Sequence, residues 1–312
     1  MTIHIWGFKR LLQSLGTLLL VASVLFFIFQ IVGGDPSQAL AGKNTDLKTL
    51  QILRTQLGLD QSVAVQFKIF MEQILCWNWG TSWVNHRPVG QLIAEGFGPS
   101  FAILTASLLT SLILAYLMAL WSVAKRGTWI DVVLKNGMSV LISLHFVVIV
   151  IVVQYVFAYR FHLFPVYGWA AGWASVSYAI LPYGAHALGS LAPKFFTLRA
   201  LLEGQVHEQY IQTALAKGCS WPRVYFIHLT RNIIPGLSAL ISAQLPSVLA
   251  GSVVLEIYWG IPGLGLLLLK SIQASDYPVV KAMTLLGAAF YIFTVFIGDM
   301  FTFYSLRREV PS

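Results

Sequence analysis

The sequence predicts an all-α integral membrane protein with six transmembrane helices and an extramembrane helical segment after the first of them. Of its 312 residues, 57% are hydrophobic and only 10% are charged, so the chain cannot cover a soluble fold with a polar surface. Uncharged runs of about 20 residues recur along the chain, and helices of that length cross the hydrocarbon core of a bilayer. Most basic residues flank these runs, as they do where they set the orientation of a membrane protein.

The first span is predicted at residues 11–32, an uncharged run that follows Lys9 and Arg10. The alternative is a cleavable signal peptide, because residues 39–41 resemble a cleavage site. A signal core has roughly 7 to 15 apolar residues, which is fewer than this run contains. We therefore expect a transmembrane helix that ends at the turn-forming residues 33–36.

Residues 37–99 are predicted to lie outside the membrane and to contain two short amphipathic helices. Apolar residues recur at helical spacing in 50–57 and again in 63–74, and a turn at residues 58–60 separates the two runs. A cluster of tryptophans follows, at Trp77, Trp79 and Trp83. Such a cluster is typical of a membrane interface, and a surface that stacks on a ligand is the alternative.

The other five spans are predicted at residues 100–124, 136–159, 176–198, 234–255 and 282–304. The second and third spans are close in sequence, so we expect them to form an antiparallel hairpin. Pro165, Pro182 and Pro193 are expected to interrupt helicity around the fourth span. Pro235 and Pro246 are expected to kink the fifth.

The distribution of Lys and Arg predicts that both termini lie in the cytoplasm. In that orientation the inner segments hold 12 of the 20 basic residues, and the two short outer loops hold Arg160, Lys270 and Lys281. The remaining five lie in the long outer segment, which the positive-inside rule does not count. Orientation thus accounts for the net charge of +8, and no nucleic-acid partner is expected. Cys76 and Cys219 fall on opposite sides of the membrane and are not expected to pair.

Residues 207–235 form the longest markedly polar interval in the second half of the chain. Residues 208–217 are predicted to form a helix, Gly218 stands where a C-terminal cap belongs, and Ser220 with Pro222 begins a second helix. A helix, a glycine turn and another helix beside membrane spans have the form of a docking element rather than of a catalytic pocket. The alternative is a loop whose charges only fix orientation.

This interval resembles the signature loop of permease subunits of binding-protein-dependent ABC importers, most closely those of the peptide and nickel class. By position, Gln212, Thr213 and Ala214 occupy the places of the family's Glu-Ala-Ala, and Gly218 that of its glycine. Because Gln replaces the acid, an ion pair through that acid is not available here. The residues that carry the likeness are Tyr210, Thr213, Ala214, Ala216, Lys217, Gly218, Arg223, Arg231, Asn232 and Pro235.

The likeness extends over nearly the whole chain. It implies the type I permease fold of ABC importers, with a first helix and an external segment over residues 1–98, a five-helix core over 99–304 and a cytoplasmic tail over 305–312. Within that core, residues 203–233 would be the loop that couples to an ATPase. Further landmarks similar to the family lie at residues 34–36, 57–61, 79–89 and 164–166.

The resemblance also implies a function. The chain would form half of the translocation pathway of an importer in a bacterial inner membrane, with di- or oligopeptides as cargo and nickel as the alternative. Its partners would be a second permease, two cytoplasmic ATPases, an extracytoplasmic binding protein and membrane lipid. The sequence contains no Gly-x-x-x-x-Gly-Lys-Ser/Thr motif, so ATP and Mg²⁺ would bind the partner subunits. We expect no cofactor, no metal ligand and no catalytic residue on this chain, and hence no enzyme.

A glycine-rich turn at residues 259–265 is another feature that resembles the family. A phosphate-binding loop is not expected there, because no Gly-Lys-Ser/Thr follows and the surroundings are apolar. The turn resembles the outer-face turn after the fifth helix of such permeases, and it would lead into a short helix at 266–274. Its candidate residues are Gly260, Pro262, Gly263 and Gly265.

Polar residues within or at the rim of spans are costly in lipid and are candidates for function. Glu256 is expected to hold the turn that follows it, or else to contact substrate. Asp299 is expected to pair with Arg307 or Arg308. Each intramembrane histidine is expected to be a hydrogen-bonded packing residue, or else to face a pathway for a metal. The four residues are His145, His186, Glu256 and Asp299.

Two other functions are disfavoured. An intramembrane protease would need a second membrane-embedded Asp, and the Gly-x-Gly-Asp arrangement is absent at Asp299. A carrier driven by an ion gradient would have internal repeats and ion sites near mid-membrane, and neither is evident in the sequence.

Overall fold

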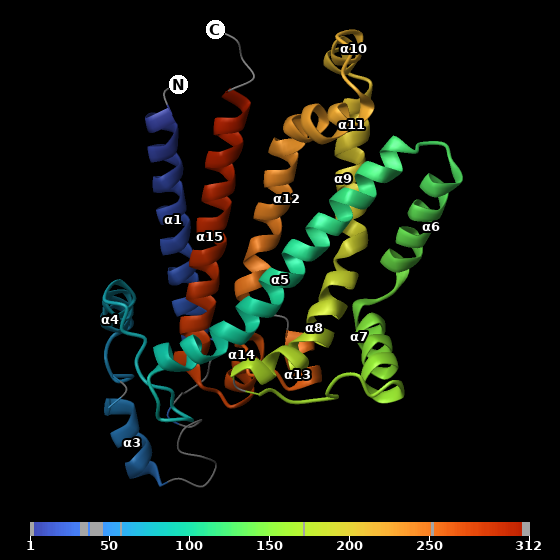
Figure 1. Cartoon of the computed structure of the whole chain (residues 1–312). Helices are drawn as coiled ribbons and strands as arrows, with labels where there is room; N and C mark the ends of the chain where they lie inside the picture. The colour runs from blue at the N-terminus through green and yellow to red at the C-terminus, as the bar shows by residue number, and fades with distance from the viewer. Residues whose placement is uncertain are drawn as a thin grey trace. The chain divides into compact units, whose positions relative to one another are not determined.

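The computed structural model describes residues 3–31, 37, 46–56, 58–170, 172–250 and 253–307. All secondary-structure elements in these ranges are helical (Figure 1), which confirms the predicted all-α class. They divide into two compact units: residues 1–98 with 263–296, and residues 99–262 with 297–312. The predicted helix end at residues 32–36, the cleavage-like residues 39–41, Leu57 and Arg308 lie outside the described residues.

The first unit contains the N-terminal helix and the extramembrane segment. α1 (Ile3–Ile31) carries no charge after Arg10. α3 (Leu47–Gln56) and α4 (Val63–Leu75) follow, separated by a turn at Gly58, whose φ of +67° suits glycine. Phe26 of α1 and Phe70 of α4 are buried in one cluster. This contact holds α4 against the last turns of α1.

α14 (Leu264–Gln273) and the first part of α15 (Tyr277–Arg307) complete this unit. Asp276, directly before α15, is 1% exposed. Its carboxylate accepts a hydrogen bond from the Ser82 hydroxyl and another, at 3.0 Å, from the backbone N–H of Trp83. These bonds join two segments 193 positions apart in the sequence.

The second unit is built from the remaining helices, which pack around two buried apolar clusters. One cluster surrounds α9 and α10, and the other lies among α5, α7, α8 and α13. In chain order its elements are α5 (Val89–Ala124, from residue 99), α6 (Trp129–Ser143), α7 (Phe146–Gln154), the π-helical η1 (Tyr155–Arg160), the 3-10 helix η2 (Gly172–Ala174), α8 (Ser175–Gly189), α9 (Leu191–Val206), α10 (Gln209–Ala216), α11 (Trp221–Arg223), the π-helical η3 (Val224–Leu229), α12 (Thr230–Ala250) and α13 (Val253–Trp259).

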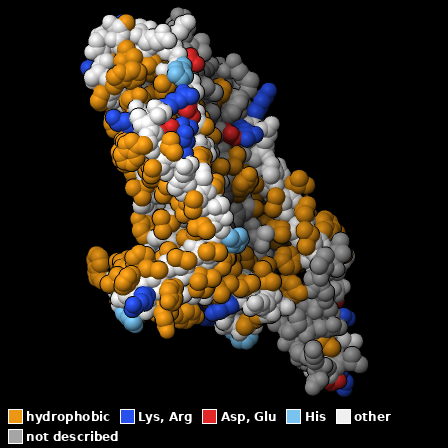
Figure 2. Space-filling view, turned by 90° about the vertical axis from the view of Figure 1, so that its right-hand side faces the viewer, with side chains coloured by type: hydrophobic (Ala, Val, Ile, Leu, Met, Phe, Trp, Pro, Cys, Tyr) orange, Lys and Arg blue, Asp and Glu red, His pale blue; other side chains and the backbone are white. Residues whose placement is uncertain are grey.

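Exposed apolar side chains cover the outer faces of α5, α6 and α7, among them Leu117, Val133 and Ile151. In Figure 2 hydrophobic side chains cover most of the face shown, and a group of acidic and basic ones lies together in its upper part. Water does not favour so much contiguous apolar surface, whereas lipid does. This surface agrees with an integral membrane protein.

Four described helices are long and apolar enough to cross a membrane: Gly7–Gln30, Val89–Ala124, Trp221–Leu245 and Tyr277–Met300. They correspond to the predicted first, second, fifth and sixth spans. Two broken helix pairs raise the number to six if each pair is one span. One pair, α6 with α7 and η1, covers the predicted third span. The other, α13 with α14, lies where the sequence predicts a turn and a short outer helix, so the exact set of six spans stays a prediction.

The third span is not the continuous helix predicted at 136–159. α6 ends at Ser143, and α7 begins at Phe146 after a bend of 97°. Leu144 between them is extended, with a ψ of 127°. The Nδ1 of His145 accepts the backbone N–H of Val147 at 3.3 Å and so caps the new helix. His145 is therefore an exposed cap at a helix break, and its predicted place within a continuous span is wrong.

The prolines around the fourth span interrupt helices less than predicted. Pro182 lies inside α8, and Pro193 lies in the first turn of α9, where its missing N–H costs no intrahelical bond. The break in the predicted span 176–198 falls at Ser190 instead. With 15 and 16 residues, neither α8 nor α9 is long enough to cross a bilayer alone.

Two helices begin earlier than predicted. α5 starts at Val89 rather than at residue 100, and Pro99 lies within it. α15 starts at Tyr277 rather than at residue 282. The added turns contain charged residues such as Glu95, which end an apolar run in the sequence without ending a helix.

Candidate functional site

α10 and α11 form the helix, turn and helix that the sequence predicts. α10 covers Gln209–Ala216, one residue less at each end than predicted. Gly218 follows with a φ of +83°, a left-handed conformation that glycine adopts without steric cost. The N–H of Gly218 donates to the carbonyl of Leu215 at 2.9 Å, and the N–H of Cys219 donates to that of Ala214 at 3.1 Å. These two bonds make a Schellman cap, so Gly218 ends α10.

The second helix starts directly after this turn. Ser220 has the extended backbone of an N-cap, and Pro222 lies in the first turn of α11, where helices accept proline. The ring of Trp221 stacks on that of Tyr225 in η3, with centroids 5.5 Å apart. Because α11, η3 and α12 follow one another without a gap, the turn at Gly218 is joined directly to a long apolar helix.

One face of α10 lies in the protein core. Ile211 and Ala214 are 1% and 7% exposed, and they share a buried cluster with Leu198 of α9. The hydroxyl of Tyr210 donates to the Oε1 of Gln205 at 2.9 Å. The spacing of three residues between the two buried positions is that of an amphipathic helix. α10 is thus packed against η3 and bonded through Tyr210 to the last turns of α9.

The other face of α10 is exposed, together with the turn. A Cβ added at Gly218 would meet no atom within 4 Å, so the space beside the turn is open. Seven predicted coupling residues are exposed: Gln212, Thr213 and Ala216 in α10, Lys217 and Gly218 in the turn, Arg223 in α11 and Arg231 in α12. Exposed polar residues on a rigidly capped turn are suited to bind another protein.

Asn232 and Pro235 lie elsewhere. Both are half-buried in α12 rather than in the turn. The hydroxyl of Ser238 donates to the carbonyl of Pro235 at 2.7 Å. These two predicted coupling residues belong to the helix that follows the exposed surface.

A buried carboxylate ties α9 to α5 and α6. Asp131 of α6 is 2% exposed. Its Oδ1 accepts the Ser122 hydroxyl of α5 at 2.6 Å and lies 3.3 Å from the Nη2 of Arg199 in α9. Its Oδ2 lies 3.2 Å from the Nζ of Lys135 and accepts the N–H of Gly127 at 3.4 Å. Each oxygen has two partners, which offset the cost of burying the charge.

Arg199 extends this network toward α10. Its Nη1 donates to the Oε2 of Glu203 at 2.6 Å, and the Oε1 of Glu203 lies 3.4 Å from the Nε of Arg126. The Nη1 of Arg126 lies 3.1 Å from the Nε2 of His207, which is the C-cap of α9. The network therefore connects the end of α5 and the start of α6 with the last turns of α9, directly before α10.

One face of α5 carries four buried serines, each bonded to an ionisable side chain of another helix. Intervals of 7, 4 and 11 residues place them on one side of the helix. A hydroxyl both donates and accepts, so the same face serves acids and bases. The pairs are Ser100 with Glu256 Oε1 at 2.6 Å, Ser107 with His186 Nδ1 at 2.7 Å, Ser111 with Lys194 Nζ at 2.6 Å, and Ser122 with Asp131 Oδ1 at 2.6 Å.

The acidic residues predicted in spans have different surroundings. Glu256 is 3% exposed in α13, and its backbone carbonyl accepts the N–H of Ile261 in the turn that follows at 2.9 Å. Asp299 is half-buried in α15, and its pairing with a C-terminal arginine stays a prediction. Within the described ranges, no three His, Cys, Asp or Glu side chains are grouped so that they would hold a metal ion.

The glycine turn after α13 is tightly packed at its first glycine. Gly260 has a φ of +69°, and an added Cβ would lie 2.3 Å from the Cζ of Tyr167. Only glycine fits such a site without displacing the ring. Pro262 is exposed, whereas Gly263 is the N-cap of α14 and Gly265 is buried in it. That the turn faces outward stays a prediction.

Two buried charged residues were not recognised from the sequence as paired. From the sequence, Asp131 is interpreted as part of a polar stretch between spans. Lys135, four positions later, is a signal that could have indicated an ion pair. Lys194 reads as a residue that reaches the inner face. It is instead 1% exposed, and its Nζ donates to the hydroxyls of Ser111 at 2.6 Å and Ser190 at 2.9 Å.

Comparison with known proteins places this architecture in one family. Residues 111–309 match the family described as "Binding-protein-dependent transport system inner membrane component", and residues 5–113 match its N-terminal companion, "Binding-prot-dependent transport system membrane comp, N-term".

Similar proteins align over nearly their whole length. The glutathione transport system permease proteins GsiC of Salmonella choleraesuis strain SC-B67 and of Pectobacterium atrosepticum are each 32% identical over 295 residues, 94% of both chains. GsiC of Escherichia coli strain K12 is 30% identical over 296 residues, again 94% of both chains. Because the family match and these relatives together cover almost all of the chain, the protein belongs to the binding-protein-dependent transport system inner membrane components, as an ABC importer permease of the peptide and nickel class.

Proposed function

We propose that this chain is one of two permease subunits that enclose the pathway of an ATP-driven importer for di- or oligopeptides, and that a cytoplasmic ATPase docks on α10 and the Gly218 turn. The construction of α10 carries the proposal. One face is packed in the core, and the other is exposed beside the open space at Gly218. A partner that presses on the exposed face moves the core behind it, because close-packed interiors transmit displacement.

Movement of α10 has two routes into the membrane helices. Ile211 and Ala214 share a buried cluster with Val224 of η3, which leads through apolar packing to α12. The ion pair between Arg199 and Asp131 leads from α9 to α6, and through Ser122 to α5. The helices before and after α10 therefore move with it. As the two ATPases close and reopen, the pathway alternates between outward-open and inward-open.

Near the Gly218 turn the docking surface offers cations, whereas its exposed acid, Glu208, is the N-cap at the other end of α10. Exposed Gln212 is neutral, and Lys217 and Arg223 are exposed nearby in the sequence. We expect the ATPase groove to present carboxylates or carbonyl oxygens to them, since complementary charges fix register and partner choice. ATP and Mg²⁺ bind to the ATPases in this scheme, and this chain supplies the movement of the pathway.

Peptide cargo is proposed from the class and from the names of the relatives. Those relatives are permeases for glutathione, which is a tripeptide. A binding protein on the outer side would deliver the cargo, with both termini of this chain in the cytoplasm and six spans in the membrane.

The test is uptake by the whole importer in proteoliposomes, with the second permease, the ATPases and the binding protein present. Gly218→Trp places a bulky side chain where the ATPase docks. We expect ATPase co-purification and peptide uptake to fall about tenfold or more, while membrane insertion is unchanged. Gly172→Trp is the matched control, because Gly172 also has a positive φ, of +65°, and an added Cβ there would meet no atom within 4 Å.

Full uptake by Gly218→Trp would refute the docking role. Uptake by the purified chain alone, without ATPases, would identify a carrier driven by an ion gradient.

A further inference from the structure

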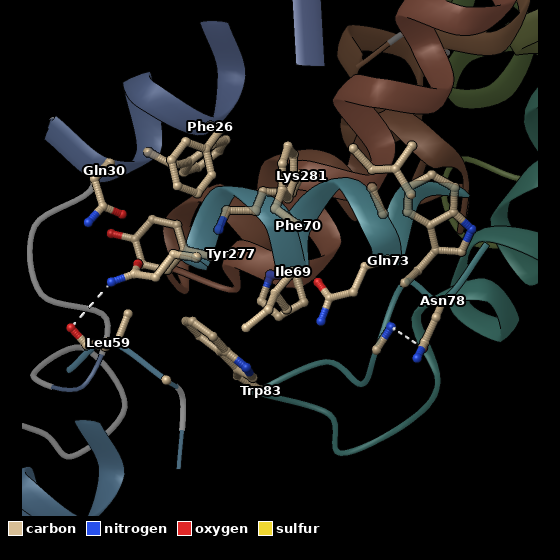
Figure 3. A pocket seen from close by; sticks show the side chains of 18 of the residues that line it. Phe26, Gln30, Leu59, Ile69, Phe70, Gln73, Asn78, Trp83, Tyr277 and Lys281 are labelled. Carbon is tan, nitrogen blue, oxygen red and sulfur yellow. Dashed lines mark hydrogen bonds between the residues drawn. The ribbon is translucent and has the colours of Figure 1, made fainter. Parts of the chain in front are cut away.

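The first unit contains a cavity that the coupling element does not explain. Its volume is about 840 Å³, within the range of pockets that hold small molecules. The last turns of α1, α4, the loop after α4 and the first turns of α15 bound it (Figure 3). Its aromatic lining consists of Phe26, Phe29, Phe70, Trp79, Trp83 and Tyr277.

Lys281 of α15 brings a positive charge to this lining. Its Nζ lies 5.4 Å from the ring centroid of Phe29 and 5.9 Å from that of Phe70. Figure 3 shows the Lys281 side chain with Phe70 and Tyr277 among the residues that line the cavity. In the part of the chain that the structure describes, no carboxylate forms an ion pair with this ammonium. Aromatic faces attract a cation, but they do not neutralise it.

Side-chain amides supply hydrogen-bond donors in the same cavity. Gln30 and Gln73 line it, and each carries an NH₂ group with two donors. The NH₂ group of Gln66, which also lines it, is already bonded to the carbonyls of Leu59 at 3.3 Å and Gln61 at 2.9 Å. Arg54 and Asp60 also line the cavity, so its charged side chains are two cations and one carboxylate. Two cations together with amide donors form a set that binds the oxygens of an anion.

The cavity lies where two apolar spans end. Gln30 is the last residue of the span Gly7–Gln30, and Tyr277 is the first of the span Tyr277–Met300. Trp, Tyr and Lys concentrate where hydrocarbon meets lipid headgroups. α4 beside the cavity exposes two apolar side chains on one side, Val65 and Ile69, which are four positions apart. The cation and the amide donors are therefore at the depth of phospholipid headgroups.

We propose that this cavity holds the phosphate headgroup of an outer-leaflet phospholipid, with Lys281 as its counter-ion. The phosphate oxygens accept bonds from the ammonium and the neighbouring amides. The acyl chains leave over the apolar side of α4, where Ile69 lines the cavity and is itself exposed. A phospholipid fits better than a soluble anion, because its chains also cover side chains that would otherwise face water. The bound lipid joins α1, α4 and α15 and holds the extramembrane segment on the membrane surface.

The test measures lipid retention by the full chain purified in detergent, with native mass spectrometry during titration with phosphatidylglycerol and with phosphatidylethanolamine. Lys281→Met keeps the length of the side chain and removes its charge, whereas Lys281→Arg keeps the charge. Lys270→Met is the matched control, because Lys270 is exposed on α14 of the same unit and does not line the cavity. We expect Lys281→Met to weaken retention about tenfold or more, and the other two variants to retain lipid like the wild type.

A second measurement uses the unmodified protein and does not depend on the folding of a variant. Lys281 should be protected from an amine-reactive reagent in phosphatidylglycerol nanodiscs and become reactive after delipidation, while Lys270 reacts in both. Equal retention by Lys281→Met and wild type, or equal reactivity of Lys281 in both states, would overturn the proposal. Displacement of the lipid by millimolar inorganic phosphate would also overturn the proposal, because it would identify a soluble ligand. Loss of tripeptide binding in Lys281→Met, with lipid retention unchanged, would overturn it for the same reason.

Discussion

Replacing Asp131 by Asn should destabilise the second unit, because it leaves Arg199 and Lys135 without their shared carboxylate. Breaking one side of a buried ion pair costs about 3 to 5 kcal/mol. Arg199 is only 13% exposed but keeps Glu203 at 2.6 Å, and Lys135 is 38% exposed and reaches water. We therefore expect the lower end of that range, about 3 kcal/mol lost from the free energy of unfolding. Peptide uptake per ATP hydrolysed should fall too, since the route from α9 to α6 is weakened.

The assay is equilibrium unfolding of the purified chain in mixed micelles, followed by tryptophan fluorescence. A double-mutant cycle of Asp131→Asn with Arg199→Met isolates the pair, and we expect a coupling energy of about 1 to 3 kcal/mol. Lys68→Met is the control, because its pair with Glu72 spans 3.8 Å with both side chains more than half exposed, and it should cost less than about 0.5 kcal/mol. Additive effects of the two network mutations would refute the pairing of Asp131 with Arg199 and the coupling route that depends on it.

The remaining predictions concern topology and packing. A membrane-impermeant maleimide should label exposed Cys76 in spheroplasts. It should label Cys219, beside the Gly218 turn, only in inverted vesicles. Labelling of Cys219 from the outside would contradict the predicted topology. Gly260→Ala should cost about 3 kcal/mol, because the left-handed backbone and the Tyr167 ring both oppose a Cβ. Tyr167→Ser should recover part of that loss in the same titration, and no recovery would place the strain elsewhere. Lys194→Met should raise the free energy of unfolding by about 1 kcal/mol, because hydroxyls alone do not offset a buried ammonium; a large decrease would indicate an anionic partner.

The Gly218 turn was predictable because its determinants are local. A glycine after an amphipathic run, followed by Ser220 and Pro222, specifies a cap and a new helix within a few residues. The backbone at Gly218 and the two capping bonds match that prediction. Which face of α10 is buried also follows from its period, because Ile211 and Ala214 are the apolar positions three residues apart.

The break at His145 was not predictable in the same way. Residues 136–159 read as one uncharged run without a proline, and hydropathy alone does not distinguish a straight span from two bent helices. The break depends on an extended Leu144 and on a histidine that caps the next helix. Histidine is not among the usual capping residues, so no composition rule marks this site.

The sequence alone determined that the chain belongs in a membrane, that its regular structure is helical and that a capped turn follows α10. Those properties depend on hydropathy and on contacts between near neighbours. Only the tertiary structure decided which buried charges meet and where the Lys281 cavity lies. Asp131 and Arg199 are 68 positions apart, and Ser82 and Asp276 are 194 positions apart. Local periodicity carries no information about partners at such separations, because packing of whole helices brings them together.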